Sequence, residues 1–304
     1  MFDINNYYRY LFNTLKTMIK FLFFFSFLLF YKSSFADCSK AKDTSRIVVA
    51  GGSITEILFF LNESQNIVAV DTTSNFPEDA KSFPSIGYVR ALSTEGVLSL
   101  NPTLIIGEND MGPKNVLEQL KKTNIELRVL DEKNSIKGIE DKISCISNIL
   151  GINKSEKLVE NIGFKESVSN LRMVSKVNSK KNIKGLVILM MQGTSPVVAG
   201  RNTSGGDFLE MIGSKNTMNS FEGWKPAGKE AILLSNPNFI LITNRAIKNY
   251  SSLNSFLKES GIEMTEAAQT KSVYPLDGMS FLGFGPRTIN SGLEISNKIY
   301  EKFK

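Results

Sequence analysis

Short apolar runs alternate along this chain with segments whose apolar residues recur at helical spacing. Apolar runs that predict buried strands lie at 46–50, 67–70, 103–106, 127–130, 185–190, 239–242 and 273–274. Segments that predict helices lie at 54–61, 114–122, 136–150, 204–213 and 253–258, with a last one ending at 304. Such alternation is typical of an α/β fold whose mostly parallel sheets are covered on both faces.

The alternation is interrupted by a polar stretch at 154–180 that contains no proline. We predict one long, largely solvated helix there, although two shorter helices broken near Gly163 would also fit. At about 1.5 Å per residue, about 25 helical residues span about 38 Å, which is enough to join two lobes. The sequence therefore predicts two Rossmann-like α/β lobes, at 37–153 and 181–304, joined by one long rigid helix.

A repeat supports the division into two lobes. The segment 95–102 is echoed by 230–237, and in both copies a glutamate, Glu95 or Glu230, precedes a proline by seven residues. Because proline interrupts a helix, each copy predicts a helix led by a glutamate, then a stop, then a buried strand.

The first 36 residues are typical of an export signal. Three basic residues precede an apolar run at 21–31, and the segment 34–36 offers small residues for cleavage. A retained membrane anchor is the second interpretation, because the run is about half as long as the ~20 residues of a spanning helix. A lipoprotein is less favoured, since Asp37 stands before Cys38 where lipid attachment needs a small residue.

Charge and residue usage narrow the function. Of 36 basic and 30 acidic residues, the first 36 positions hold four and one, which leaves 32 against 29 and argues against a nucleic-acid surface. No histidine is present, so nitrogen-rich zinc sites and Ser/His/Asp or Cys/His catalysis are excluded. Cys38 and Cys145, the two cysteines, can form one disulfide in an oxidising compartment or remain free thiols.

A glycine-rich turn follows the first strand. Ser53 is a good N-cap for the helix after it, and Glu56, three residues later, would complete a capping box. The amides of Gly51, Gly52 and Ser53 could also point at an anion such as a phosphate. Because the full glycine pattern of a dinucleotide site is missing, we favour a simple turn, and a phosphate-binding enzyme is a distant alternative.

Several motifs carry a family resemblance. They lie at 49–56, 70–74, 87–96, 198–201 and 283–288, and include Gly87-Tyr88-Val89-Arg90 and Gly283-Phe284-Gly285-Pro286-Arg287. Together they resemble the substrate-binding proteins of bacterial ABC importers that have two α/β lobes on one rigid helix. Within that group the chain is most similar to the periplasmic haem-binding proteins. The motifs that begin at Gly87 and at Gly283 discriminate best against siderophore and cobalamin binders.

The resemblance implies that Tyr88 is the axial ligand of haem iron and that Arg90 is its neighbour. Ferric iron suits a hard anionic ligand such as phenolate, and tyrosine is an established haem ligand. Phenol ionises near pH ~10, so a guanidinium two residues away can favour the anion by charge and hydrogen bonding. In an extended loop residues i and i+2 point the same way, which lets both side chains face the ligand.

Haem needs further partners. Its propionates call for cations, for which the second lobe offers Lys225, Arg245, Arg201 and Arg287. Arg287 could equally tie the last helix to the loop before it. Porphyrin faces need apolar contacts, and the candidates, each of which could equally belong to the core, are Trp224, Phe281, Phe284 and Met279.

One position departs from the family pattern. Several relatives carry a histidine ligand in the loop that opens the second lobe, where this chain reads Met190-Met191-Gln192-Gly193. We therefore expect five-coordinate iron held by Tyr88 alone. Met191 as a weak sixth ligand is disfavoured, because buried methionines usually fill gaps in cores.

The resemblance also implies partners. Glu95 and Glu230 match the acidic residues by which this class docks onto arginines of the membrane permease, although carboxylates near helix starts also suit the helix dipole. The implied function is a monomeric, non-enzymatic periplasmic carrier that captures haem between its lobes and delivers it to an ABC permease and its ATPase. A ferric-siderophore or corrinoid binder of the same fold is the alternative.

Overall fold

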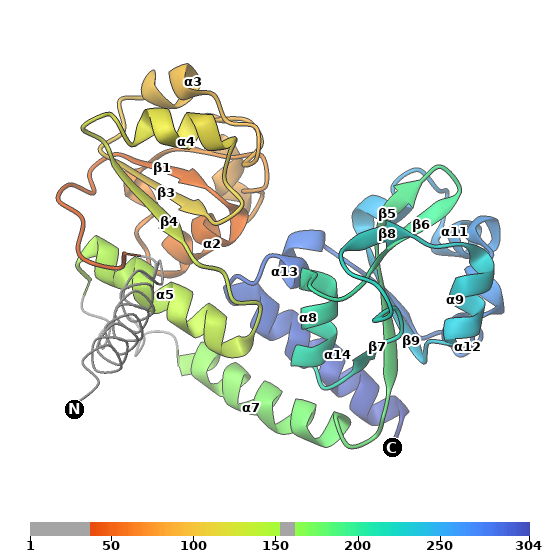
Figure 1. Ribbon diagram of the computed structural model, residues 1–304. Helices are drawn as coiled ribbons and strands as arrows, with labels where there is room; N and C mark the ends of the chain where they lie inside the picture. The colour runs from red at the N-terminus through yellow and green to blue at the C-terminus, as the bar shows by residue number, and fades with distance from the viewer. Residues whose placement is uncertain (1–36, 153–161) are drawn as a thin grey trace, which may run out of the picture. The chain divides into compact units, whose positions relative to one another are not determined.

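The computed structural model describes residues 37–152 and 162–304, which contain two sheets (Figure 1). Sheet A has the order β2-β1-β3-β4, and every pairing in it is parallel. Its strands are β1 (Ile47–Ala50), β2 (Ile67–Val70), β3 (Leu104–Glu108) and β4 (Glu126–Leu130). The four strands expected in the first lobe are confirmed. Their residues are mostly apolar because both faces of the sheet are buried.

Helices cover both faces of sheet A. Figure 1 shows α3 and α4 on one face and α2 and α5 on the other. The bounds are α2 (Gly52–Phe60), α3 (Thr94–Leu98), α4 (Lys114–Leu120) and α5 (Ile136–Leu150), with short 3-10 turns η1 (Ser64–Asn66) and η2 (Glu78–Ser82). Parallel strands place all their carboxyl ends at one edge of the sheet, and this edge positions the candidate site.

Sheet B is mixed but still mostly parallel, since β6 runs opposite to the other five strands. Its order is β10-β9-β5-β6-β8, with β7 also pairing β5. The strands are β5 (Lys184–Gln192), β6 (Ser195–Ala199), β7 (Lys215–Asn216), β8 (Trp224–Pro226), β9 (Phe239–Thr243) and β10 (Val273–Leu276). β6 and β8 run antiparallel to their neighbours. Strand β6 is antiparallel to β5 because a short turn joins them, and such turns join antiparallel strands. Gly193 in this turn has a φ of 59°.

The helices of the second region are α8 (Ser204–Met211), α9 (Lys229–Ser235), α10 (Asn244–Ile247), α11 (Leu253–Ser260), α12 (Glu266–Gln269), α13 (Gly278–Leu282) and α14 (Pro286–Lys302), with the 3-10 turn η3 (Ile262–Met264). Figure 1 shows α9, α11 and α12 on one side of sheet B, and α8 and α14 on the other. Helix α13 is capped at its start by the side chain of Asp277, which accepts from the Ser280 amide at 3.0 Å.

Helix α7 (Ile162–Asn178) covers most of the predicted linking segment. It packs along α14, where Asn178 Nδ2 donates to the carbonyl of Ser296 at 3.0 Å. Gly163 lies within α7, while residues 154–161 and the predicted signal at 1–36 lie outside the described residues. Within 37–152 and 162–304, no helix has the length and apolar character needed to span a membrane.

The predicted repeat is confirmed in both regions. Helices α3 and α9 begin beside Glu95 and Glu230, and β3 and β9 follow them. The second residue after each glutamate is buried, Val97 at 1% and Ile232 at 0% exposure, whereas both glutamates are exposed. The repeated sequence therefore encodes the same helix-to-strand unit twice.

Cys38 and Cys145 form a disulfide, with their Cα atoms 4.9 Å apart. Of the two states that the sequence left open, the structure has the bonded one. The disulfide attaches the segment before β1 to α5, and the amide of Ala41 donates to the carbonyl of Ile149 at 2.8 Å nearby. Since the Cys38 sulfur takes part in this bond, it cannot also carry a lipid.

Candidate functional site

Tyr88 and Arg90 lie on a loop at the carboxyl edge of sheet A. The amide of Ile86 donates to the carbonyl of Val70, the last residue of β2, at 2.9 Å, which fixes the loop to the sheet. Ile86 and Val89 are buried, whereas Tyr88 is 45% exposed and Arg90 is also exposed. The apolar side chains anchor the loop, and the two predicted ligand-binding side chains on either side of Val89 remain at the surface.

A second segment, residues 110–112, supports this loop. The amide of Gly112 donates to the carbonyl of Val89 at 3.0 Å. Asp110 pairs with Arg90, whose Nε and Nη2 atoms lie 2.8 Å and 2.6 Å from Asp110 Oδ2. The hydrogen bond to Asp110 raises the pKa of Arg90, which keeps the guanidinium charged.

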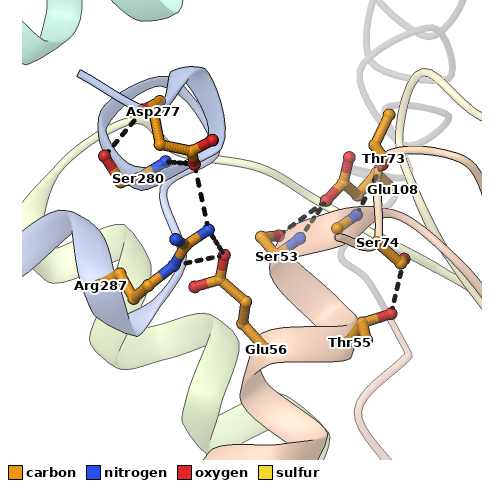
Figure 2. Close-up of polar contacts among 10 residues, drawn as sticks. Ser53, Thr55, Glu56, Thr73, Ser74, Glu108, Asp277, Ser280 and Arg287 are labelled. Atoms are coloured by element: carbon orange, nitrogen blue, oxygen red, sulfur yellow. Dashed lines mark hydrogen bonds and ion pairs between the residues drawn. The ribbon is translucent and has the colours of Figure 1, made fainter. Parts of the chain in front are cut away.

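The start of α2 lies at the same edge of the sheet, and its capping differs from the prediction (Figure 2). The capping box of Ser53 and Glu56 is wrong, because the helix starts after Gly51 without a side-chain cap. The Ser53 hydroxyl donates instead to Glu108 Oε1 at 2.7 Å, and Glu56 binds Arg287. Glycine is required at 51, where φ is 147° and a Cβ would lie 2.4 Å from the Glu108 side chain.

The chain's own oxygens occupy the amides of the glycine-rich turn. The three bonds are Gly51 N to Asp71 Oδ1 at 3.0 Å, Gly52 N to Thr73 Oγ1 at 2.9 Å, and Ser53 N to Glu108 Oε1 at 3.3 Å. One of these acceptors is the carboxylate of Asp71, which suits the positive end of the helix dipole. These three amides are therefore not available to a phosphate, which removes the basis of the enzyme alternative.

Glu108 belongs to a buried polar network beside this turn. Lys142 Nζ donates to Ser53 Oγ at 2.8 Å and pairs with Glu132. Burial raises the pKa of Glu108 to about 8, the negative charge of Glu132 adds to the rise, and Lys142 opposes it. Glu108 is therefore mainly protonated at neutral pH.

The sequence-based prediction did not include these polar groups, although the sequence contains a signal for some of them. Asp71 directly follows β2, Glu108 ends β3, and Asp110 comes two residues later. Polar residues at the carboxyl ends of parallel strands gather at one edge of the sheet. Lys142 gave no such signal, since lysines of amphipathic helices are usually solvated.

Arg287 connects α14 with the first α/β region. Its Nε and Nη2 atoms lie 3.0 Å and 2.6 Å from Glu56 Oε1, and Nη2 is 3.4 Å from Asp277 Oδ1 (Figure 2). Its guanidinium carbon lies 3.7 Å from the ring centroid of Phe76. Burial raises the pKa of Glu56, and Arg287 opposes this rise. These contacts favour the structural role among the two that the sequence left open for Arg287.

Three second-lobe candidates lie together. Trp224 and Lys225 are neighbours on β8, where they pair with Ala199 and Val198 of β6. The amide of Arg201, two residues after β6, donates to the carbonyl of Phe221 at 2.8 Å. Arg201 and Lys225 are exposed and Trp224 is half-buried, so this group presents two cations and an indole.

The remaining candidates lie elsewhere. Arg245 is exposed on α10, and Met279 is half-buried on α13. Phe281 and Phe284 are buried, with 0% and 1% exposure, so they belong to the core and offer no ring face to a ligand in this structure. Met191 packs against the core of the second region. Among the described residues, no cluster of three Cys, Asp or Glu side chains could hold a bare metal ion.

The two α/β regions resemble those of known binding proteins. Residues 47–279 match the family described as periplasmic binding protein, and the chain belongs to that family. A solved periplasmic heme-binding protein from Pseudomonas aeruginosa is similar to the chain, with 30% identity, a TM-score of 0.72, and coverage of 86% of this chain and 94% of that one.

Curated relatives agree on the class. An uncharacterized ABC transporter substrate-binding lipoprotein, YvrC of Bacillus subtilis, is 26% identical over 267 residues, which cover 87% of this chain and 82% of that protein. A vitamin B12-binding protein of Pectobacterium atrosepticum is 21% identical over 201 residues, 65% of this chain and 71% of that protein. The chain is therefore a substrate-binding protein of an ABC transporter.

The buried Glu108 predicts a pH dependence of stability. Because its folded-state pKa is raised from 4.5 to about 8, the folded protein retains a proton that the unfolded chain releases, so this contribution to stability is lost as the pH rises through that window. Glu108→Gln cannot ionise and should exceed the wild type in stability above this window by about a few kcal/mol. Urea unfolding at about pH 5, 7 and 9 measures the difference.

The exposed residue Glu78 provides the control for this experiment, as Glu78→Gln should follow the wild-type pH dependence. Parallel stability curves for the wild type and Glu108→Gln would contradict the prediction.

The Arg287 contacts predict a loss of stability on truncation. Arg287→Ala leaves the Glu56 carboxylate, whose side chain is 4% exposed, without its cation, and should lower the free energy of unfolding by about 3 kcal/mol or more. Adding Glu56→Gln should restore part of the loss, because the amide carries no charge. Arg172→Ala, which removes a more exposed ion pair with Glu140, should cost less than about 1 kcal/mol in the same denaturation assay. Equal losses in the two alanine variants would rule the explanation out.

Proposed function

We propose that this protein binds haem outside the cytoplasmic membrane, with the Tyr88 phenolate as the axial ligand of the iron, and carries it to an ABC permease. The observation that carries the proposal is the placement of Tyr88. Its side chain is 45% exposed, on a loop hydrogen-bonded to the edge of sheet A, and the Arg90 guanidinium lies two residues away on the same loop.

The chemistry of the pair suits ferric haem. A phenolate supplies a hard anionic oxygen to the iron, and a permanently charged guanidinium nearby stabilises that anion. The rigid loop reduces the ordering required on binding, because Ile86 and Val89 already fix the backbone on both sides of Tyr88. Coordination by Tyr88 alone leaves the iron five-coordinate, since Met191 packs against the core.

The group of Trp224, Lys225 and Arg201 supplies the remaining chemistry. Two exposed cations can bind the propionates, and the indole offers an apolar face to the porphyrin. Arg245 is a further candidate for a propionate. Arg287 is not included, because it already neutralises Glu56.

A corrinoid is the second candidate ligand, supported by the similarity to a vitamin B12-binding protein. The two candidates make different demands on Tyr88. Haem iron has an open axial position that a phenolate can fill, whereas the cobalt of cobalamin already has its axial ligands. Tyr88 should therefore determine the affinity for haem and matter little for a corrinoid.

Tyr88→Phe should weaken hemin binding at least about tenfold and abolish the phenolate-to-iron absorption, because the ring stays while the coordinating oxygen is lost. Titration followed by the Soret band measures both effects. Tyr300→Phe, at a tyrosine that is 38% exposed on α14, is the matched control and should bind like the wild type.

Two results would overturn the haem proposal. One is a wild-type protein without saturable hemin binding, and the other is unchanged affinity and spectrum in Tyr88→Phe. Saturable binding of cyanocobalamin that Tyr88→Phe leaves intact would then favour the corrinoid candidate.

We further propose that Glu95 and Glu230 contact the permease. Both carboxylates are exposed at the starts of equivalent helices, α3 and α9, one in each α/β region. Exposed charges at the rim of an interface mainly direct association. They can therefore act in delivery without taking part in ligand binding.

Replacing both residues, as Glu95→Ala with Glu230→Ala, should leave hemin affinity unchanged and reduce several-fold the stimulation of ATP hydrolysis by the reconstituted transporter. Glu301→Ala, at an exposed acid of α14, serves as the control. Full stimulation by the double variant would exclude these positions as the docking contacts.

A further inference from the structure

Asp110 binds only one edge of the Arg90 guanidinium. Nε donates to Asp110 Oδ2 at 2.8 Å, and Nη2 forms an ion pair with the same oxygen at 2.6 Å. These two nitrogens form the side edge of the planar group, whereas Nη1 and the second hydrogen of Nη2 form its end. In the part of the chain that the structure describes, Nη1 has no hydrogen-bond partner, so the end of the guanidinium can still donate to an oxygen.

Asp110 is the better fixed member of this pair. Its side chain is 31% exposed against 61% for Arg90. The amide of Met111 donates to the carbonyl of Glu108 at 3.0 Å, and that of Gly112 to the carbonyl of Val89 at 3.0 Å. The carboxylate therefore projects from a segment that is bonded to β3 and to the Tyr88 loop, and it restricts a long side chain that would otherwise sample many rotamers.

Fold stability does not account for this arrangement. Ion pairs of exposed side chains contribute little to stability, and Arg90 is mostly exposed. Moreover, Asp110 Oδ1 is buried without a hydrogen-bond partner among the described residues, which is unfavourable for a carboxylate. A side chain held this way is better explained by what it does for its partner.

We propose that Asp110 is a positioning residue of the ligand site. It holds Arg90 by its side edge, so that the end of the guanidinium faces the Tyr88 phenolate oxygen that binds the ligand. This inference rests on the proposed binding of haem through Tyr88. Holding Arg90 in advance lowers the ordering needed when the ligand binds. Asp110 itself need not touch the ligand.

The test is a double-mutant cycle on hemin binding with Asp110→Ala, Arg90→Ala and the combined variant. Asp110→Ala should weaken binding about tenfold and shift the phenolate-to-iron absorption towards that of Arg90→Ala. If Asp110 acts through Arg90, the combined variant should bind like Arg90→Ala alone. Asp110→Asn retains an acceptor oxygen and should recover part of the affinity.

Asp79→Asn, at an exposed acid of the same α/β region, is the control and should bind like the wild type. Unchanged unfolding midpoints in all variants would separate positioning from loss of fold.

The outcomes distinguish the inference from the function on which it rests. Hemin binding by the wild type with equal affinity and spectrum in Asp110→Ala would overturn the inference alone, as would additive losses in the combined variant. Absence of hemin binding by the wild type would overturn the proposed function and this inference with it.

Discussion

The contact between Arg287 and Glu56 is a buried ion pair that connects the two α/β regions. It joins the helix that follows β1 to the last helix of the chain, and α14 in turn packs along α7. A buried carboxylate requires its cation, because an unpaired charge in that position costs several kcal/mol, on the order of 3–5. An arginine held in this way is not free to bind a propionate. The cations of the proposed ligand site are therefore the exposed ones, Lys225 and Arg201.

The fold was largely predictable because hydrophobic period is a local property of the sequence. Each apolar run expected as a strand in the first region is a strand of sheet A, and the repeated segment forms the same unit in both regions. Sheet B is mixed because Gly193 allows a tight turn after β5, and strand direction is decided by such turns rather than by hydrophobicity. The predicted capping box is wrong because a distant residue decides the contact: Ser53 binds Glu108, which lies 55 residues away.

The candidate site could be proposed from the sequence only where its residues lie in one short motif. Tyr88 and Arg90 belong to one such motif, whereas Asp110 lies 20 residues from Arg90, and Glu56 lies 231 residues from Arg287. Residue type indicated these groups as polar but could not pair them, because pairing follows from the order of the parallel strands. Burial decided against Phe284 in the same way, as an aromatic side chain in a conspicuous motif proved to be core.

The two copies of the repeat are alike in backbone but not in surface. Four residues after the leading glutamate, on the same face of the helix, the first copy has Ser99 and the second has Leu234, which is 87% exposed. A partner built from two identical subunits would thus meet a polar surface on one side and an apolar one on the other. Its symmetry would be broken by the binding protein, so that two chemically equal halves would have unequal contacts for as long as the complex lasts.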